Sequence, residues 1–445
     1  MALTWRPTSL PAARSRTDDV FFLDENLGWA VNSDGKVFRT TDGAANWEEQ
    51  QLFRDSYLRC LAFASPSDGW IGAIYGPHPL YRTRDGGRTW APVEGLPPGG
   101  PGRICGLVAV SETVVFAAGT NFPDEPAGVF RTTDGGETWD AVDLGGAPAA
   151  LIDILFTDPA TGWVVGGLDE VRHPDRTTER RDLVPAVFAT TDGGETWTNV
   201  VAPLADLGAF PRGEWGWKIQ KLGESTLFVS LENFHDGAIL RSDDLGRTWR
   251  RLRINDRQRN ANLEGVGFLD ERRGWVGGWG DYFFGGGYTS ATEDGGENWV
   301  DANHVGFRVN RFRFLGDPVR VGYASGDTVY KLSDEPIPPA ALATPAPEPD
   351  LAGEEGIGFS VEVPAGARRL EVLVWDRFGR LVRRLNPPGD PTPGPCRIDW
   401  DFTTEDGAGA PPGEYILRVL IDEAATSRVA RRLPLHRLAD TGENP

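Results

Sequence analysis

The chain has 445 residues, enough for more than one domain, and a formal net charge of −20. This acidity argues against nucleic-acid binding, which needs a basic surface, and against adsorption to anionic lipid. No long apolar run occurs and the first residues lack the apolar core of an export signal, so we expect neither a membrane span nor a cleavable leader.

A motif with the pattern Ser/Thr-x-Asp-x-Gly-x-x-Trp recurs six times between residues 40 and 299, at intervals of about 50 residues. A period of this length built from short strands is typical of a β-propeller with one four-stranded blade per repeat. The aspartate can accept backbone N–H bonds in a tight turn. We therefore interpret the six aspartates as structural: Asp42, Asp85, Asp134, Asp192, Asp244 and Asp294.

One copy departs from the pattern, because Ala44 stands where the other five have glycine. The position calls for a left-handed backbone, which costs a residue with a side chain about 1–2 kcal/mol. We therefore expect the first turn to be looser or differently shaped.

Strand-like segments precede each motif. In the first repeat they span residues 20–24, 28–31 and 37–40. Gly-Trp begins the second strand in repeats one, two, four and six, while Phe116 and Phe228 replace the tryptophan in repeats three and five. We interpret these aromatic side chains as wedges between blades.

A partial seventh repeat follows the sixth motif, with strands predicted at residues 310–315, 321–325 and 328–332 but no motif and no fourth strand. Residues 3–7 resemble the strand that follows the second motif, at 88–92. We predict a seven-bladed propeller, residues 1–335, whose N-terminal strand completes the last blade. Such closure removes the open edges of a sheet.

The rest of the chain predicts a second all-β unit. Residues 336–352 are rich in Pro and Ala and form a linker. Alternating strands and Gly-containing turns between residues 353 and 432 predict a small Ig-like β-sandwich, and 433–445 form a tail.

The three cysteines match no metal motif and cannot all pair. Cys60 and Cys105 fall on the innermost strands of adjacent blades, so the sequence leaves open whether they touch. We expect reduced, buried thiols, no metal site and no cofactor.

Residues 19–332 resemble Asp-box (BNR) propellers of the photosystem II stability/assembly factor (Ycf48-like) group, because Phe-x-Asp, Gly-Trp-x-Val-Gly and Thr-x-Asp-Gly-Gly-x-Thr-Trp recur in that order. This resemblance implies a non-catalytic assembly factor that docks on a protein complex, for some members a membrane protein. Sialidases and xyloglucan hydrolases share the box. A sialidase site cannot be placed, since Arg6-Pro7 lacks the middle residue of the Arg-Ile-Pro segment.

Residues 355–422 resemble the FlgD-type Ig-like domain, through Val374-Trp375-Asp376, Ile398-Asp399-Trp400-Asp401 and Pro412-Gly413-Glu414-Tyr415. Such domains usually end bacterial surface or secreted proteins, whereas the missing export signal indicates the cytoplasm by default. The location therefore stays open. Phe402 replaces the glycine common after Trp-Asp, so we expect a different turn there.

Propeller topology predicts where a ligand would bind. The Asp-box turns join strands three and four, so the loops between strands two and three and those between blades lie on the opposite face. The long loops fall there, and loops on a rigid scaffold often carry function. One of them, residues 279–288, is aromatic and glycine-rich and suits a sugar or a protein groove. The candidate binding residues are His78, Arg172, His173, Trp215, Trp217, His235, Trp279, Asp281, Tyr282, Phe283, Phe284 and Tyr288.

Two functions remain for this face: a scaffold that binds a protein partner, or a carbohydrate-active hydrolase or lectin. Two carboxylates about 5–10 Å apart at the centre would favour the hydrolase. A flat surface of aromatic and arginine side chains would favour the scaffold. We favour the scaffold and name no catalytic residue, because the sequence context sets no carboxylate pair apart.

Overall fold

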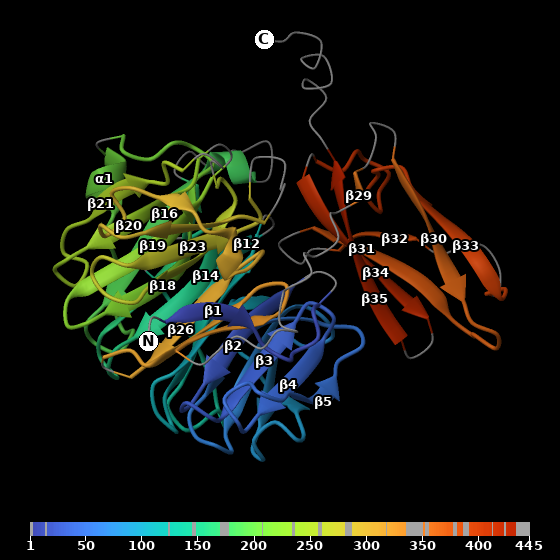
Figure 1. The fold of residues 1–445 in the computed structure, drawn as a ribbon, viewed down its shortest axis with the longest axis horizontal. Helices are drawn as coiled ribbons and strands as arrows, with labels where there is room; N and C mark the ends of the chain where they lie inside the picture. The colour runs from blue at the N-terminus through green and yellow to red at the C-terminus, as the bar shows by residue number, and fades with distance from the viewer. Residues whose placement is uncertain are drawn as a thin grey trace, which may run out of the picture.

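The computed structural model describes residues 3–13, 16–122, 125–144, 148–169, 178–206, 208–233, 236–256, 260–280, 287–316, 318–334, 350–351, 356–376, 381–385, 391–411, 413–421 and 424–432. These residues are almost all in strands and turns (Figure 1). Within them, seven four-stranded sheets are followed by a five-stranded and a two-stranded sheet.

Blade one contains β2 (Thr17–Phe22), β3 (Gly28–Asn32), β4 (Lys36–Thr40) and β5 (Glu48–Leu52), and blade two contains β6 (Tyr57–Phe63), β7 (Gly69–Tyr75), β8 (Leu80–Thr83) and β9 (Ala91–Pro92). Blade three contains β10 (Arg103–Ala109), β11 (Val115–Asn121), β12 (Glu125–Thr132) and β13 (Asp140–Val142), and blade four contains β14 (Ala150–Phe156), β15 (Gly162–Asp169), β16 (Leu183–Thr190) and β17 (Thr198–Asn199). Blade five contains β18 (Trp215–Leu222), β19 (Thr226–Glu232), β20 (Ala238–Ser242) and β21 (Arg250–Arg253), and blade six contains β22 (Leu263–Phe268), β23 (Gly274–Gly278), β24 (Thr289–Thr292) and β25 (Val300–Asp301). Blade seven contains β26 (Arg311–Leu315), β27 (Val321–Ser325), β28 (Val329–Ser333) and β1 (Thr4–Pro7). Short helices lie between strands: η1 (Arg180–Asp182), α1 (Ala202–Asp206) and η2 (Asn303–Val305).

The blades form a closed ring. The innermost strands β2, β6, β10, β14, β18, β22 and β26 contact one another in that order, and β26 also contacts β2. The two ends of the propeller meet in one sheet, of order β1-β28-β27-β26. β1 pairs antiparallel with β28, Trp5 opposite Leu332. The predicted seven-bladed fold, with the N-terminal strand completing the last blade, is confirmed.

The Asp-box turns hold together through the aspartate and the Ser/Thr before it. In the second blade, Asp85 Oδ1 accepts the Thr89 N–H at 2.9 Å and Oδ2 accepts the Thr89 hydroxyl at 2.6 Å. The Gly87 N–H donates to Thr83 Oγ1 at 2.9 Å, and Trp90 Nε1 donates to the Gly87 carbonyl at 3.0 Å. Although burial would raise it, these hydrogen bonds lower the pKa of Asp85 to about 2.

The expected departure at Ala44 is wrong. Ala44 takes φ 70°, close to the glycines at its position, and its N–H donates to Thr40 Oγ1 at 3.1 Å as in the other turns. In the fifth box Leu245 likewise takes φ 57°. The hydrogen bonds of the turn therefore impose a left-handed backbone even on residues that resist it. Phe402, in the C-terminal domain, also takes a left-handed backbone, φ 55°.

The aromatic residues of the second strands pack between neighbouring blades, as predicted. Trp29 stacks on Phe63 of the next blade with ring centroids 3.6 Å apart, and Phe116 stacks on Phe156 at 4.0 Å. Two further stacks follow the same rule: Phe228 on Phe268 at 3.6 Å, and Tyr323 on Phe22, across the junction of the last and first blades, at 3.5 Å.

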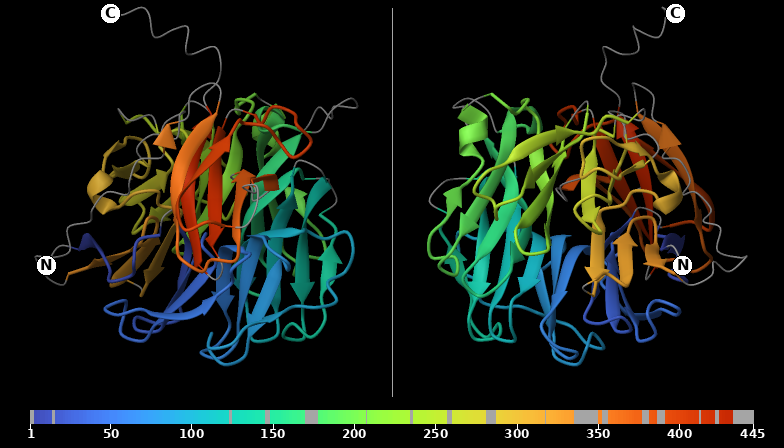
Figure 2. Two further views of the ribbon diagram at one scale, coloured as in Figure 1. Left: turned by 90° about the vertical axis from the view of Figure 1, so that its right-hand side faces the viewer. Right: turned by 60° about the vertical axis from the view of Figure 1, so that its left-hand side comes forward.

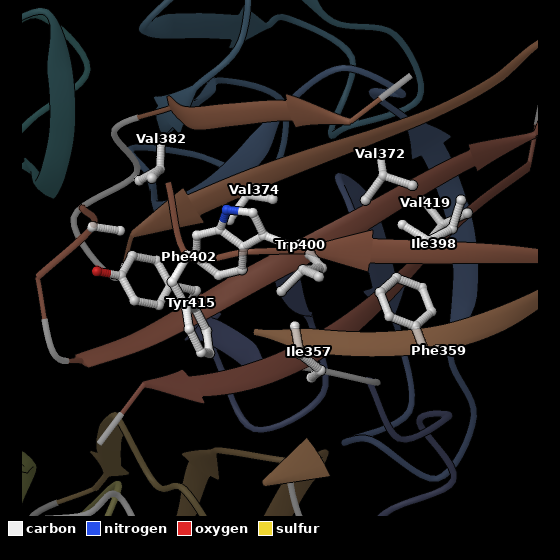
Figure 3. Close-up of a cluster of buried hydrophobic side chains, with 12 residues drawn as sticks. Ile357, Phe359, Val372, Val374, Val382, Ile398, Trp400, Phe402, Tyr415 and Val419 are labelled. Atoms are coloured by element: carbon white, nitrogen blue, oxygen red, sulfur yellow. The ribbon is translucent and has the colours of Figure 1, made fainter. Parts of the chain in front are cut away.

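The C-terminal domain is a small sandwich. Its strands are β29 (Asp350–Leu351), β30 (Ile357–Val363), β31 (Leu370–Asp376), β32 (Leu381–Leu385), β33 (Gly394–Trp400), β34 (Gly413–Ile421) and β35 (Ala424–Arg432). The sheet β29-β35-β34-β31-β32 faces the pair β30-β33 across a core that includes Val374, Trp400, Phe402 and Tyr415 (Figure 3). In the described part of the chain, no helix is long and apolar enough to cross a membrane.

Candidate functional site

The C-terminal domain lies against the propeller (Figure 2). Its contact is with the face opposite the Asp-box turns, where the innermost strands begin. We call this propeller surface the mouth; its residues are Tyr57, Ile74, Tyr75, Cys105, Phe122, Ala150, Ile152, Leu183, Trp215 and Trp217. These residues come from blades two to five. The sequence predicted a binding face here, but it did not predict that the chain's own second domain would occupy it.

Among the described residues of the C-terminal domain, Leu373 and Trp375 of β31 and Leu420 of β34 are buried against the mouth, and the partly buried Leu381 of β32 packs beside them. Trp375 is fully buried, with its ring centroid 4.1 Å from that of Tyr75 and 5.8 Å from that of Tyr57. Burying an aromatic side chain of this size contributes about 4–6 kcal/mol before the entropy cost of ordering. Trp375 is therefore the main anchor of the contact.

Charged residues lie beside this apolar contact on β31 and β32. Glu371 accepts a hydrogen bond from Arg384 Nη1 at 2.9 Å and pairs with Arg369. The hydrogen bond and charge of Glu371, together with Asp55 of the propeller, raise the pKa of Arg369. Asp55 and Arg369 thus place opposite charges across the interface.

A network of buried charges lies directly beneath the mouth, at the centre of the ring; we call it the hub. Asp18 Oδ1 accepts hydrogen bonds from Arg16 Nη2 at 2.9 Å, Arg59 Nη1 at 2.8 Å and the Tyr57 hydroxyl at 3.2 Å. Arg16 also pairs with Glu264. Since Tyr57 touches both Asp18 and the docked Trp375, it connects the hub to the mouth.

A second part of the hub is built on Arg311. Its Nη1 and Nη2 each lie 2.7 Å from an oxygen of Asp153, and its Nε lies 3.1 Å from Asp19. Burial alone would raise the pKa of Asp153, but the charge of Arg311 keeps it lowered. Burial and the charge of Arg311 also lower the pKa of Lys218 to about 8.

The carboxylates of the hub are buried and bound by arginine. These carboxylates, Asp18, Asp19, Asp153 and Glu264, are each at most 1% exposed. All four are paired with arginine, and burial raises the pKa of Asp18 although the charges of Arg16 and Arg59 oppose the rise. Cys60 and Cys105 lie nearby as free, buried thiols whose pKa values burial raises. Among the described residues, no group of three or more His, Cys, Asp or Glu side chains could hold a metal ion.

The sequence-predicted binding residues fall into three groups. Trp215 and Trp217 are buried in the mouth beneath the C-terminal domain, and Trp279 is buried in the hub, where its Nε1 donates to Glu264 Oε1 at 3.1 Å. As placed, these three indoles pack inside the molecule. His78 and Tyr288 are partly exposed. The others lie outside the described residues and stay predictions: Arg172, His173, His235, Asp281, Tyr282, Phe283 and Phe284.

Comparison with known proteins agrees with this architecture. The family model for the photosynthesis system II assembly factor YCF48 matches residues 1–145, and that for the FlgD Ig-like domain matches residues 349–424. The search of curated proteins found no match to this chain.

Solved structures with the same fold include "YCF48 bound to D1 peptide", 17% identical, with a TM-score of 0.51 over 75% of this chain and 98% of that one. YCF48 from Cyanidioschyzon merolae is 18% identical, with a TM-score of 0.51 over 74% and 98%. The GH74 xyloglucanase from Xanthomonas campestris is 13% identical, with a TM-score of 0.53 over 96% and 75%. The chain is thus a seven-bladed Asp-box β-propeller with similarity to the YCF48 assembly factors, followed by a domain similar to the FlgD Ig-like domain.

Proposed function

We propose that this protein is a non-catalytic binding scaffold, an assembly factor or accessory subunit, that engages a protein partner through the propeller face opposite the Asp-box turns. The observation that carries the proposal is the mouth itself. It is a broad aromatic surface that already accepts an apolar protein face, with Trp375 against Tyr57 and Tyr75. Buried aromatic anchors of this kind dominate the energetics of protein interfaces.

Two further observations support a protein partner. The solved relative described as YCF48 bound to D1 peptide is a propeller of this fold with a peptide ligand. The alternative is a carbohydrate-active protein, which the similarity to a GH74 xyloglucanase favours, but that similarity is one of fold alone. A glycosidase also needs two carboxylates flanking the scissile bond. The central carboxylates here are buried and paired with arginine.

The test is affinity capture of partners by the tagged full chain, read by mass spectrometry. The matched variants are the triple replacement by serine of Tyr282, Phe283 and Phe284, which the sequence predicts to lie on this face, and Glu137→Ala on an exposed Asp-box turn. We expect the triple variant to lose the partner and Glu137→Ala to keep it. Equal capture by both variants, or release of reducing sugar from xyloglucan by the wild-type chain, would overturn the proposal.

A further inference from the structure

The outer face of the Ig-like sheet is apolar where it meets the propeller. Along β31, Val372 and Val374 point into the core of the Ig-like domain, whereas Leu373 and Trp375 point the other way. On β34, Val419 points into the core of the Ig-like domain and Leu420 points toward the propeller. The outer face of such a sheet is normally polar, because it faces water. This face therefore has the composition of a docking surface.

The contact joins two parts of one chain through a proline-rich segment, residues 336–349. A tethered domain acts on its site at an effective concentration in the millimolar range, far above that of a free partner. Contacts between domains of one chain resemble transient protein–protein interfaces, so such domains can separate and return. Asp55 and Arg369 carry opposite charges at the edge of the contact, and dissolved salt weakens the attraction between them.

We propose that the Ig-like domain is a removable cover of the mouth, anchored by Trp375, which a protein partner has to displace to reach this surface. Its regulatory meaning rests on the function proposed above, since only a partner that uses this face needs the mouth uncovered. The apparent affinity of that partner is reduced in proportion to the fraction of molecules that are uncovered. A partner that succeeds presents an aromatic or large apolar side chain, because that is what the mouth holds in this chain.

The proposal is tested with Trp375→Ser in the full-length chain. Trp375 lies outside the Ig-like core, so the variant keeps that core while it weakens docking. We expect a larger radius of gyration by small-angle X-ray scattering and a severalfold rise in bis-ANS fluorescence as the mouth is exposed. Circular dichroism and the unfolding transition of the propeller should stay as in the wild type.

A second variant approaches the same contact from the propeller. Tyr75→Ser removes the ring nearest Trp375 and should produce the same expansion and the same bis-ANS signal. Two controls should leave the molecule closed. Trp375→Phe keeps an aromatic anchor, and Arg397→Ala removes only an exposed pair with Asp399 on the other sheet of the Ig-like domain.

If neither Trp375→Ser nor Tyr75→Ser changes the radius of gyration or the bis-ANS signal, the cover is overturned. The capture experiment separates this failure from that of the proposed function. An opened variant that captures a partner in larger amount than the wild type supports the cover and its regulatory role. Equal capture by opened and closed forms overturns the regulatory role. If the variants open but neither the opened variants nor the wild type captures a partner, the result supports the cover and counts against the proposed function.

Discussion

At the scale of single residues, the turns of this propeller show that a hydrogen-bonded motif can outweigh a local backbone preference. Ala44 and Leu245 both take positive φ where most copies of the box carry glycine. Each such residue costs about 1–2 kcal/mol. The aspartate and hydroxyl bonds of the box hold the backbone in place despite that cost.

We therefore expect Leu245→Gly to stabilise the protein. Leu245 is 40% exposed, so its side chain contributes little packing. Glycine relieves the backbone strain, but it also gives the unfolded chain more conformational freedom. The net gain in the free energy of unfolding is about 0.5–1 kcal/mol. Chemical denaturation measures it.

Val300→Gly is the matched control for Leu245→Gly. Val300 is 63% exposed on β25 and is not among the residues with positive φ. Its replacement should cost about 0.5–1 kcal/mol, as glycine does within a strand. If both variants were destabilised alike, positive φ at Leu245 would not be a source of strain.

At the scale of elements, the first strand joins the two ends of the propeller. Trp5 of β1 is buried, with ring centroids 5.5 Å from Trp275 and 5.6 Å from Phe312. Arg6 adds a hydrogen bond from Nη2 to Ser333 Oγ at 2.8 Å. Without β1, the edge of β28 would be open, and an unpaired edge is a template for another chain.

Trp5→Ala should lower the free energy of unfolding by about 3–5 kcal/mol, because a large buried ring is removed from the junction. Deletion of residues 1–9 should do at least as much and should also produce oligomers, measured by size-exclusion chromatography with light scattering. Thr4→Ala, at an exposed position of the same strand, should change little. A deletion variant that melts like the wild type and elutes as a monomer would rule out this role of β1.

At the scale of the whole molecule, the hub links blades that are far apart in the sequence. Arg311 of the seventh blade holds Asp19 of the first and Asp153 of the fourth, so one guanidinium connects opposite sides of the ring. Removing one partner from a buried ion pair leaves an uncompensated charge, which is worse than having no pair. The same contacts keep the carboxylates away from solvent.

Arg311→Met should therefore cost about 3–5 kcal/mol of stability, measured by chemical denaturation. Arg250→Met, which removes an exposed pair with Glu297, should cost less than about 1 kcal/mol. The double variant with Asp153→Asn should recover part of the loss, since it removes one stranded charge. Equal stability of the Arg311 and Arg250 variants would mean that the hub charges do not hold the ring together.

The sequence by itself determined the architecture, because its signals are local and repeated. Six Asp-box motifs, the Gly-Trp strand starts and the match of Thr4-Trp5 to a post-box strand predict the number of blades and their closure. It also identified the face with the long loops. The Ala44 turn was mispredicted, because a backbone propensity was weighed without the hydrogen bonds that oppose it.

Only the tertiary structure decided what that face contacts. The run Leu370 to Trp375 of β31 is apolar in both phases of the strand except at Glu371, a pattern typical of burial on two sides. That signal was present, but no local rule says which surface covers the second side. The hub was equally hidden, since Arg16, Asp153, Glu264 and Arg311 lie in different repeats and become partners only when the ring closes. Pairing of this kind joins residues that are far apart in the sequence and depends on the whole fold, so patterns within single segments do not predict it.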